Sequence, residues 1–325
     1  MLSNINISIL QLCILILSWY FISSLANIIG KQLLTIFPYP FSVTLTQLFH
    51  GWIYSIPLLR LIGIQQSTDV HSTRIYYITI LVPLAIGKLL SQLTSQISLR
   101  LVTISYTHTI KALMPLFTVI LSRIILDEEQ SITIYLSLLP IIIGVIITSI
   151  SELSFNIIGL ISALFSTCLL ALQNIYSKKT LKYINIHHLA LLSVLSKLSW
   201  CLLIPFWFLL DGSHMDIRRE LTPTVIYFIL IDGLCNFIYN VLAFTMISYL
   251  SSLSYAIASS TKRITIIIMS IIIFHNRITY MNLFGISLTL IGVILYNKMK
   301  YNEKKQQLLS LNTISIQPIL LSSLP

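Results

Sequence analysis

Charged residues are scarce in this chain: Asp, Glu, Lys and Arg make up only 9% of its 325 residues, against roughly 25% in soluble proteins. The four cysteines stand alone in apolar runs, which argues against a disulfide framework or a zinc site. The alternation of period two that is typical of membrane barrels is missing as well. Apolar residues are abundant, at 56% of the chain, and the mean hydropathy is +0.90. The composition excludes a water-soluble enzyme and indicates a polytopic helical membrane protein.

Apolar stretches of about 18 residues or more occur ten times, and about 20 such residues suffice for a helix to cross a bilayer. They lie near residues 7–29, 41–62, 75–97, 102–125, 132–150, 155–176, 187–210, 223–247, 252–274 and 279–297. The sequence therefore predicts an all-α membrane protein with ten transmembrane helices.

The loops between these stretches predict the orientation of the chain. The side that ten crossings give to both termini carries most of the loop Lys and Arg residues, which are typical of the cytosolic side. They are Arg60, Arg74, Lys178, Lys179, Lys182, Lys298, Lys300, Lys304 and Lys305. We therefore expect cytosolic termini, and the net charge of +10 reflects this bias and does not indicate nucleic-acid binding.

The two halves of the chain resemble each other at an offset of 148 residues. Ile143-Gly144-Val145-Ile146 returns as Ile291-Gly292-Val293-Ile294. This predicts a first repeat of five helices over 1–150, a second over 151–298, and a cytosolic tail over 299–325. An odd number of helices per repeat inverts the second copy, as in many secondary transporters, whose sites lie between the halves. A similar composition without common ancestry is the alternative.

Cations inside the apolar stretches are the most informative residues. Lys111, Lys262 and Arg263 fall in mid-helix, and Lys31 falls near the end of the first stretch. A Lys or Arg at the bilayer centre costs about 2.5–3.5 kcal/mol, so three cost roughly 8–10 kcal/mol. Asp232 is the only clear carboxylate within a stretch. An anionic ligand is the natural counter-charge, and an Arg fork suits phosphate oxygens.

Polar residues accompany these cations at helical spacing. His108 lies one turn before Lys111, Tyr239 follows Asp232 along one face, and Gln92 and Ser95 share another. They predict one central pocket, with structural alternatives. Hydroxyl groups often bond back to their own helix, His108 could bond within the bundle, and Tyr239 could only pack. The alternative for Lys31, and for two further lysines within stretches, Lys88 and Lys197, is snorkelling to the interface or pairing.

Several motifs resemble those of the plastid phosphate translocators, a branch of the drug/metabolite transporter superfamily. The resemblance covers residues 19–298. It rests on Lys31 with Phe37-Pro38-Tyr39-Pro40, Ser105-Tyr106-Thr107-His108-Thr109-Ile110-Lys111-Ala112, Glu152-Leu153-Ser154-Phe155-Asn156, Ile175-Tyr176-Ser177-Lys178-Lys179, Tyr239-Asn240-Val241-Leu242-Ala243, and Lys262-Arg263 with Ser270.

The resemblance implies strict exchange of inorganic phosphate for triose phosphate, 3-phosphoglycerate or a related compound such as phosphoenolpyruvate. It implies that three cations hold the phosphate, namely Lys111, Lys262 and Arg263. Tyr239 and Ser95 add hydrogen bonds, and Lys31 is linked to transport. No cofactor or metal is implied, and the partners are small phosphorylated metabolites and membrane lipid. The oligomeric state stays open.

Two positions depart from the family pattern. Gln92 stands where the family usually has histidine, and Met114 stands where it usually has glutamate in Lys-Ala-x-Glu-Pro. Gln92 can still donate a hydrogen bond but carries no charge. These departures bear on substrate choice and on any proton coupling.

The N-terminal segment bears on location. Only six residues, Met1–Asn6, precede the first stretch, with no basic n-region and no Arg/Ser-rich leader. A cleaved signal peptide is the alternative to a retained first helix. Similar leaderless members lie in the outermost membrane of the relict plastid (apicoplast) of apicomplexan-like parasites, so we expect that membrane here.

Rival functions follow from the same residues. A nucleotide-sugar antiporter of the secretory pathway shares the predicted architecture and would exchange a nucleotide monophosphate. An intramembrane enzyme acting on phospholipid would need a metal-ligand set, paired carboxylates or an activated nucleophile, and the sequence offers none of these. A non-transporting scaffold would have little reason to keep four cations within its helices.

Overall fold

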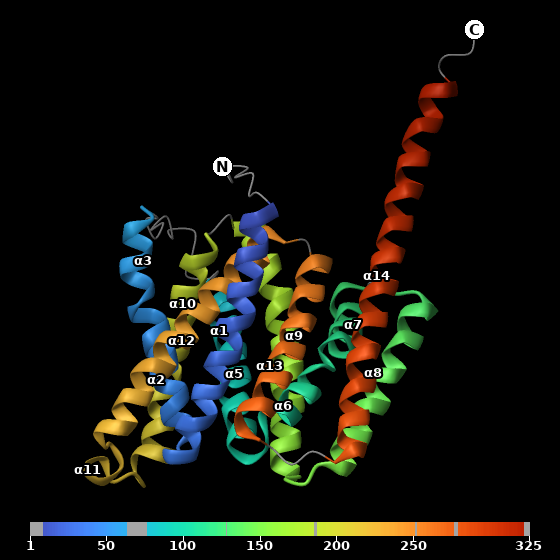
Figure 1. Cartoon of the computed structure of the whole chain (residues 1–325). Helices are drawn as coiled ribbons and strands as arrows, with labels where there is room; N and C mark the ends of the chain where they lie inside the picture. The colour runs from blue at the N-terminus through green and yellow to red at the C-terminus, as the bar shows by residue number, and fades with distance from the viewer. Residues whose placement is uncertain are drawn as a thin grey trace.

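The computed structural model is helical throughout the parts of the chain that it describes (Figure 1). Those parts are residues 9–63, 77–127, 129–184, 187–250, 252–275 and 279–321. No β-strand occurs within them. The prediction of an all-α protein is confirmed for these residues.

Long helices dominate, with short helical turns between some of them. In chain order they are α1 (Ile9–Ile36), α2 (Pro40–Ile53), α3 (Ser55–Leu61), η2 (Tyr77–Leu81), α5 (Val82–Leu101), α6 (Ile104–Lys111), α7 (Met114–Leu126), α8 (Ile132–Ser151), α9 (Ile157–Ile184), α10 (His188–Trp207), η3 (Phe208–Gly212), α11 (Ile217–Glu220), α12 (Pro223–Tyr249), α13 (Ser252–Phe274) and α14 (Tyr280–Leu321).

Eight segments of the described chain are long and apolar enough to cross a membrane, against the ten that the sequence predicts. The other two expected crossings differ from a plain apolar helix. Residues 41–62 divide into α2 and α3 at Tyr54, and α13 carries Lys262 and Arg263 within its 23 residues. The chain is therefore a multi-pass membrane protein, and the count of ten stays a prediction.

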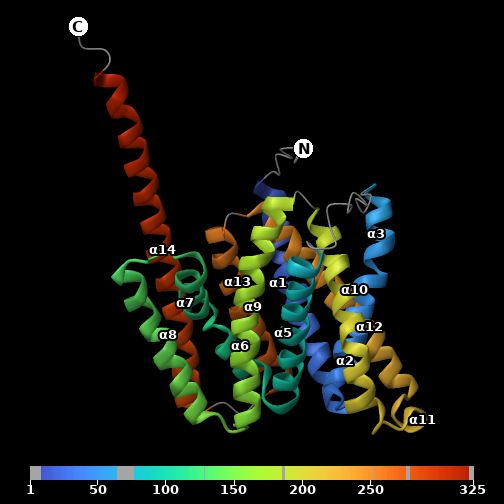
Figure 2. The ribbon, with the colours of Figure 1, turned by 180° about the vertical axis from the view of Figure 1, so that it is seen from behind.

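Two helices that lie far apart in the sequence, α8 and α14, stand side by side at one edge of the bundle (Figures 1 and 2). Glycines allow this close approach, because a Cβ on Gly144 would lie 2.7 Å from the carbonyl oxygen of Gly285. A Cβ on Gly292 would lie 2.8 Å from the backbone nitrogen of Ile141. Small residues bring membrane helices into such contact, which packing and not the hydrophobic effect stabilises.

The Phe37-Pro38-Tyr39-Pro40 motif makes the turn between α1 and α2. Pro40 opens α2, where its missing N–H costs nothing. Phe37 is buried and its ring lies 4.9 Å from that of Tyr39. Two residues after Pro40, the backbone N–H and the hydroxyl of Ser42 donate hydrogen bonds to the carboxylate of Asp211, at 2.8 and 3.0 Å. The motif thus ends α1 and starts α2.

Glu152 joins three segments at the end of α8. Its carboxylate accepts hydrogen bonds from Thr103 at 3.1 Å, from Ser154 at 2.7 Å and from Asn282 at 2.9 Å. Asn156, at the end of the same motif, caps α9 by accepting from the backbone N–H of Ile158 at 2.9 Å. This motif therefore serves the fold and stands outside the cavity described below.

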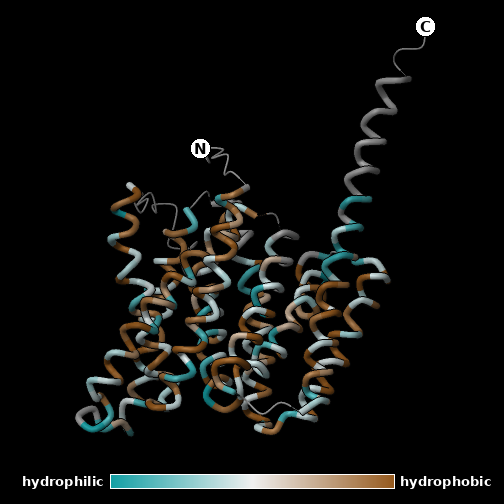
Figure 3. Tube along the Cα trace, in the orientation of Figure 1, coloured by the Kyte–Doolittle hydropathy of each residue, from teal (hydrophilic) through white to brown (hydrophobic). Residues whose placement is uncertain are grey.

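The last helix, α14, runs 42 residues and continues past the expected end of the second repeat at residue 298. Its candidate membrane-spanning part ends at Glu303, and Figure 3 shows many hydrophobic residues along this part. The helix then continues beyond the bundle (Figure 1). α1 begins at this same end of the bundle (Figure 1).

Candidate functional site

A polar cavity of about 170 Å³ lies among α1, α2, α5, α6, α7, α9, α12 and α13. Most groups that line it are polar or cationic, although the surrounding helices are apolar. Its polar lining includes Ser23, Asn27, Gln47, Lys88, Ser91, Gln92, Ser95, Gln96, His108, Lys111, Ser166, Gln173, Asn174, Asn236, Tyr239, Asn240, Tyr255, Ser259, Lys262 and Arg263. Seven of the eight predicted site residues are therefore together in one cavity, and only Lys31 lies outside it.

Lys111 stands where its membrane segment breaks. It is the last residue of α6, and α7 resumes at Met114 after a two-residue turn. Pro115 causes the break, since its ring clashes with the carbonyl four residues earlier, that of Lys111, and it lacks an N–H. The Lys111 ammonium donates a hydrogen bond to the Ser95 hydroxyl of α5 at 2.5 Å. Discontinuous helices of this kind occur at transporter substrate sites.

Lys262 lies on α13 and is only 7% exposed. Its ammonium lies 4.4 Å from the ring centre of Trp19 and 4.7 Å from that of Tyr239. It also donates to the Tyr239 hydroxyl at 3.3 Å. The aromatic faces attract the cation without neutralising it, so the positive charge is available to a ligand.

Arg263 follows directly and is also 7% exposed. Its guanidinium contacts the sulfur of Met114 at 2.7 Å, and a thioether is only a weak acceptor. Met114 lies three residues after Lys111, so this contact brings the α6–α7 break next to the two cations of α13.

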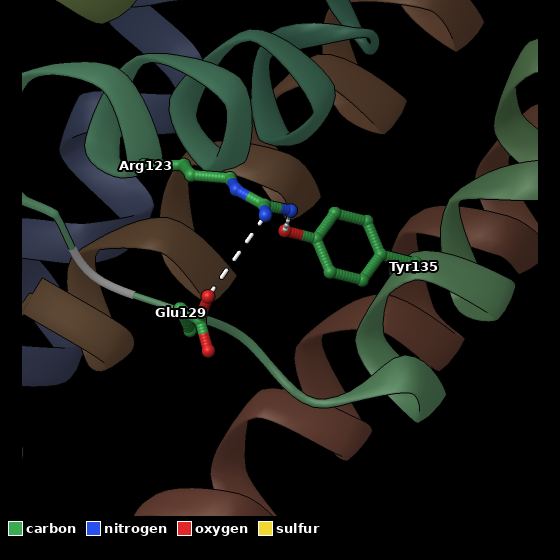
Figure 4. Close-up of polar contacts among 3 residues, drawn as sticks. All are labelled: Arg123, Glu129 and Tyr135. Carbon is green, nitrogen blue, oxygen red and sulfur yellow. Dashed lines mark hydrogen bonds and ion pairs between the residues drawn. The ribbon is translucent and has the colours of Figure 1, made fainter.

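No carboxylate among the described residues forms an ion pair with these three cations. The ion pairs of the described chain lie at the surface, as for Arg123, which stands 3.9 Å from Glu129 (Figure 4). Asp232 is buried, but it accepts a hydrogen bond from Gln47 at 2.8 Å and does not line the cavity. The cavity therefore has an uncompensated positive charge, which favours an anionic occupant.

Side-chain amides form hydrogen bonds with three further lining residues, namely His108, Gln92 and Gln96. His108 pairs through Nε2 with the amide oxygen of Asn27 at 2.9 Å. Gln92 and Gln96 both donate to the amide oxygen of Gln47, each at 2.8 Å. Because Gln47 in turn donates to Asp232, this network links α2, α5 and α12 beside the cations.

Lys31 has a different setting. Its ammonium donates to the carbonyl oxygens of Leu99 at 2.6 Å and Val102 at 2.9 Å, at the end of α5. Carbonyls at a helix C-terminus lack partners within the helix. Lys31 therefore holds the α1–α5 contact, and its link to transport stays a prediction.

Several lining residues were not expected in the site, among them Asn27 and Lys88. The amide of Asn27 is a polar group in a long apolar helix, and that signal could have placed it. Lys88 was expected to snorkel or pair, yet it is 5% exposed and lines the cavity. Lys197 is exposed, and its ammonium lies 5.6 Å from the ring centre of Trp52.

The chain is similar to known proteins along most of its length. The model of the Triose-phosphate Transporter family matches residues 10–297. The chain is 33% identical to phosphoenolpyruvate/phosphate translocator 2, chloroplastic, of Arabidopsis thaliana, over 87% of this chain and 75% of that protein. It is 32% identical to triose phosphate/phosphate translocator, chloroplastic, of Brassica oleracea var. botrytis, over 90% and 73%. With xylulose 5-phosphate/phosphate translocator, chloroplastic, of Arabidopsis thaliana, the identity is 32% over 91% and 72%.

A solved crystal structure has the same fold, with a TM-score of 0.57 and 12% identity over 87% of this chain and 98% of that chain. At that identity, the likeness speaks for the fold alone.

Proposed function

Because the chain belongs to the Triose-phosphate Transporter family, we propose that it exchanges inorganic phosphate for phosphorylated three-carbon compounds across a plastid membrane. The observation that carries this proposal is the uncompensated positive charge in the cavity. The relatives are named as phosphate translocators for phosphoenolpyruvate, triose phosphate and xylulose 5-phosphate, which share a phosphate group.

Three cations bind the phosphate in this proposal. Lys111 comes from the first half of the chain, and Lys262 and Arg263 come from the second. The guanidinium offers a planar fork that matches phosphate oxygens, and the two ammonium groups add charge from other directions. Ser95 and Tyr239, which already contact Lys111 and Lys262, orient these groups.

In this proposal the chain crosses the membrane ten times, as two inverted five-helix repeats that move against each other during transport. In this arrangement α2 with α3, and α13, are the two crossings beyond the eight apolar segments. The packing supports a two-fold relation between the repeats: α5 packs on α9 as α12 packs on α1, and α5 packs on α10 as α12 packs on α2. The matching glycines, Gly144 and Gly292, both lie where α8 meets α14. Rocking of one repeat against the other would open the cavity to either side in turn.

The requirement for exchange follows from the repulsion between the three cations of the cavity. Closing an empty cavity brings three cations together where the dielectric constant is low, which is unfavourable. A bound phosphate offsets this repulsion, because it bridges the two halves. The loaded carrier therefore reorients quickly and the empty carrier slowly, so that inward movement of one phosphate compound requires outward movement of another.

We place the protein in a plastid envelope, with the outermost membrane favoured and the termini in the cytosol. The chloroplastic relatives support the organelle. The bias of loop Lys and Arg supports the orientation, and α1 begins and α14 ends at the same end of the bundle (Figure 1).

The test is uptake of labelled phosphate into proteoliposomes of the purified protein, loaded with phosphate. Triose phosphate and 3-phosphoglycerate should compete with uptake, and a nucleotide monophosphate should not. Exchange of a nucleotide monophosphate without exchange of phosphate would contradict the proposal and indicate a nucleotide-sugar carrier.

A further inference from the structure

Lys88 is a fourth cation in the cavity, away from the three that hold phosphate in the proposed function. It lies on α5 with 5% of its surface exposed, and its ammonium donates to the hydroxyl of Ser196 on α10 at 2.8 Å. No carboxylate among the described residues forms an ion pair with it. An ammonium has three N–H donors, and a buried charge without a partner is costly. Lys88 therefore has both the charge and the donors to bind a second anionic group.

The spacing along α5 separates Lys88 from the residue of that helix that contacts Lys111. Lys88, Gln92 and Ser95 stand at positions i, i+4 and i+7, on one face of the helix. Seven residues correspond to a rise of about 10 Å. Since Ser95 accepts the hydrogen bond of Lys111 at 2.5 Å, Lys88 lies about two helical turns from the phosphate-binding end.

The opposite wall gives a similar separation. The Lys88 ammonium lies 6.0 Å from the ring centre of Phe244 on α12. On the same helix, the hydroxyl of Tyr239 accepts from Lys262 at 3.3 Å. Phe244 and Tyr239 are five residues apart, a rise of about 7.5 Å. On both helices, the residues around Lys88 thus stand at an axial rise of about 7–10 Å from the residues that contact Lys111 and Lys262.

We propose that Lys88, with Ser196 beside it, is a second anion subsite that binds the carboxylate of a phosphorylated three-carbon acid. This inference rests on the proposed function, in which the phosphate lies at the other end. In the extended acid, four bonds of about 1.5 Å separate the carboxyl carbon from the phosphorus, so these two atoms are about 5 Å apart. One bond to an outer oxygen and one charge-assisted hydrogen bond of about 2.8 Å extend this reach at each end. The acid can therefore bridge cations about 10 Å apart, which is comparable with the axial rise along the two helices.

The subsite makes the cavity selective among compounds of similar size. A triose phosphate or glycerol 3-phosphate offers a neutral oxygen to Lys88, whereas 3-phosphoglycerate offers a carboxylate. A charge-assisted contact in a buried site corresponds to a preference of about 10- to 100-fold.

The test compares two inhibitors of labelled phosphate exchange in proteoliposomes. The probes are 3-phosphoglycerate and glycerol 3-phosphate, which differ by a carboxylate against a hydroxymethyl group. We expect the wild type to prefer the acid about 10-fold or more, and Lys88→Gln to bring the ratio of the two inhibition constants close to one. Lys88→Arg should keep the preference. The matched control is Lys197→Gln, an exposed lysine on α10 outside the cavity, which should leave the ratio unchanged.

Equal inhibition by both compounds in the wild type would overturn the subsite, and so would an unchanged ratio in Lys88→Gln. The wild-type comparison decides the matter even if the variant does not fold. A wild type without phosphate counter-exchange would instead contradict the proposed function. The same two ligands are then compared by thermal stabilisation in detergent. Selective stabilisation by the acid that Lys88→Gln loses would uphold the subsite, and equal stabilisation of the wild type would overturn it.

Discussion

Replacing Arg263 with glutamine should weaken phosphate binding without weakening the fold. Arg263 is 7% exposed and has a thioether sulfur, not a carboxylate, as its contact. A hydrogen bond to a charged group is worth about 1.5–3 kcal/mol. Loss of a two-pronged guanidinium contact therefore costs roughly 3–5 kcal/mol, which raises the Kd for phosphate by about 100-fold or more.

The free energy of unfolding without phosphate should not fall in this variant, because the substitution removes a buried charge that has no acidic partner. With phosphate, the two proteins should differ. At 100 times its Kd, phosphate stabilises the wild type by about 2.7 kcal/mol, whereas a 100-fold weaker site gains only about 0.4 kcal/mol.

Thermal unfolding in detergent across a phosphate titration measures both quantities, and proteoliposome exchange gives the matching loss of transport. The matched control is Arg123→Gln, which removes a surface arginine whose ion pair with Glu129 spans 3.9 Å (Figure 4). Such a pair contributes about 0–1 kcal/mol, so the control should keep the response to phosphate. A phosphate response in Arg263→Gln equal to that of the wild type would refute the reasoning.

Three further predictions concern the scaffold. Gly285→Ala should lower the free energy of unfolding by about 1–3 kcal/mol, because its Cβ would lie 2.8 Å from the Gly144 carbonyl oxygen. The control is Gly87→Ala, where the added Cβ meets open space and should not lower it, and thermal unfolding compares the two variants. Glu152→Ala should cost about 1–3 kcal/mol by the same measurement, since it leaves three donors without their acceptor, and an unchanged midpoint would contradict the junction. Lys31→Met should lower the unfolding midpoint and slow exchange while the apparent affinity for phosphate stays the same, and a selective loss of affinity would place Lys31 in the site instead.

The cations of the site could be predicted from the sequence, because a Lys or Arg within an apolar stretch carries a free-energy cost that can be recognised without a structure. Lys111, Lys262 and Arg263 interrupt apolar stretches that are otherwise suited to a bilayer. Ionisable residues within membrane helices are costly and commonly belong to functional sites. The helix break at Lys111 also has a local signal, since Pro115 follows four residues later. The sequence thus predicted the cations but not the break, because residues 102–125 were expected to form one continuous helix with Lys111 at its middle.

The partners of these side chains could not be predicted in the same way, because they come from distant segments. Lys31 donates to a carbonyl 68 residues away, and His108 pairs with Asn27 across 81 residues. The position of the Lys88 side chain could not be predicted for the same reason. An apolar stretch with one lysine has the same sequence pattern whether the ammonium reaches the membrane interface or a cavity. Only the packing of α5 against α10 distinguishes the two.

The measurement that tests the central claim most directly is the efflux of labelled phosphate from preloaded proteoliposomes, with and without phosphate outside. The claim is that an occupied cationic cavity reorients and an empty one does not, so external phosphate should accelerate efflux strongly, and efflux without it should be slow. Equal rates under the two conditions would show that the empty carrier returns freely, and would contradict the account in which phosphate bridges Lys111 to Lys262 and Arg263.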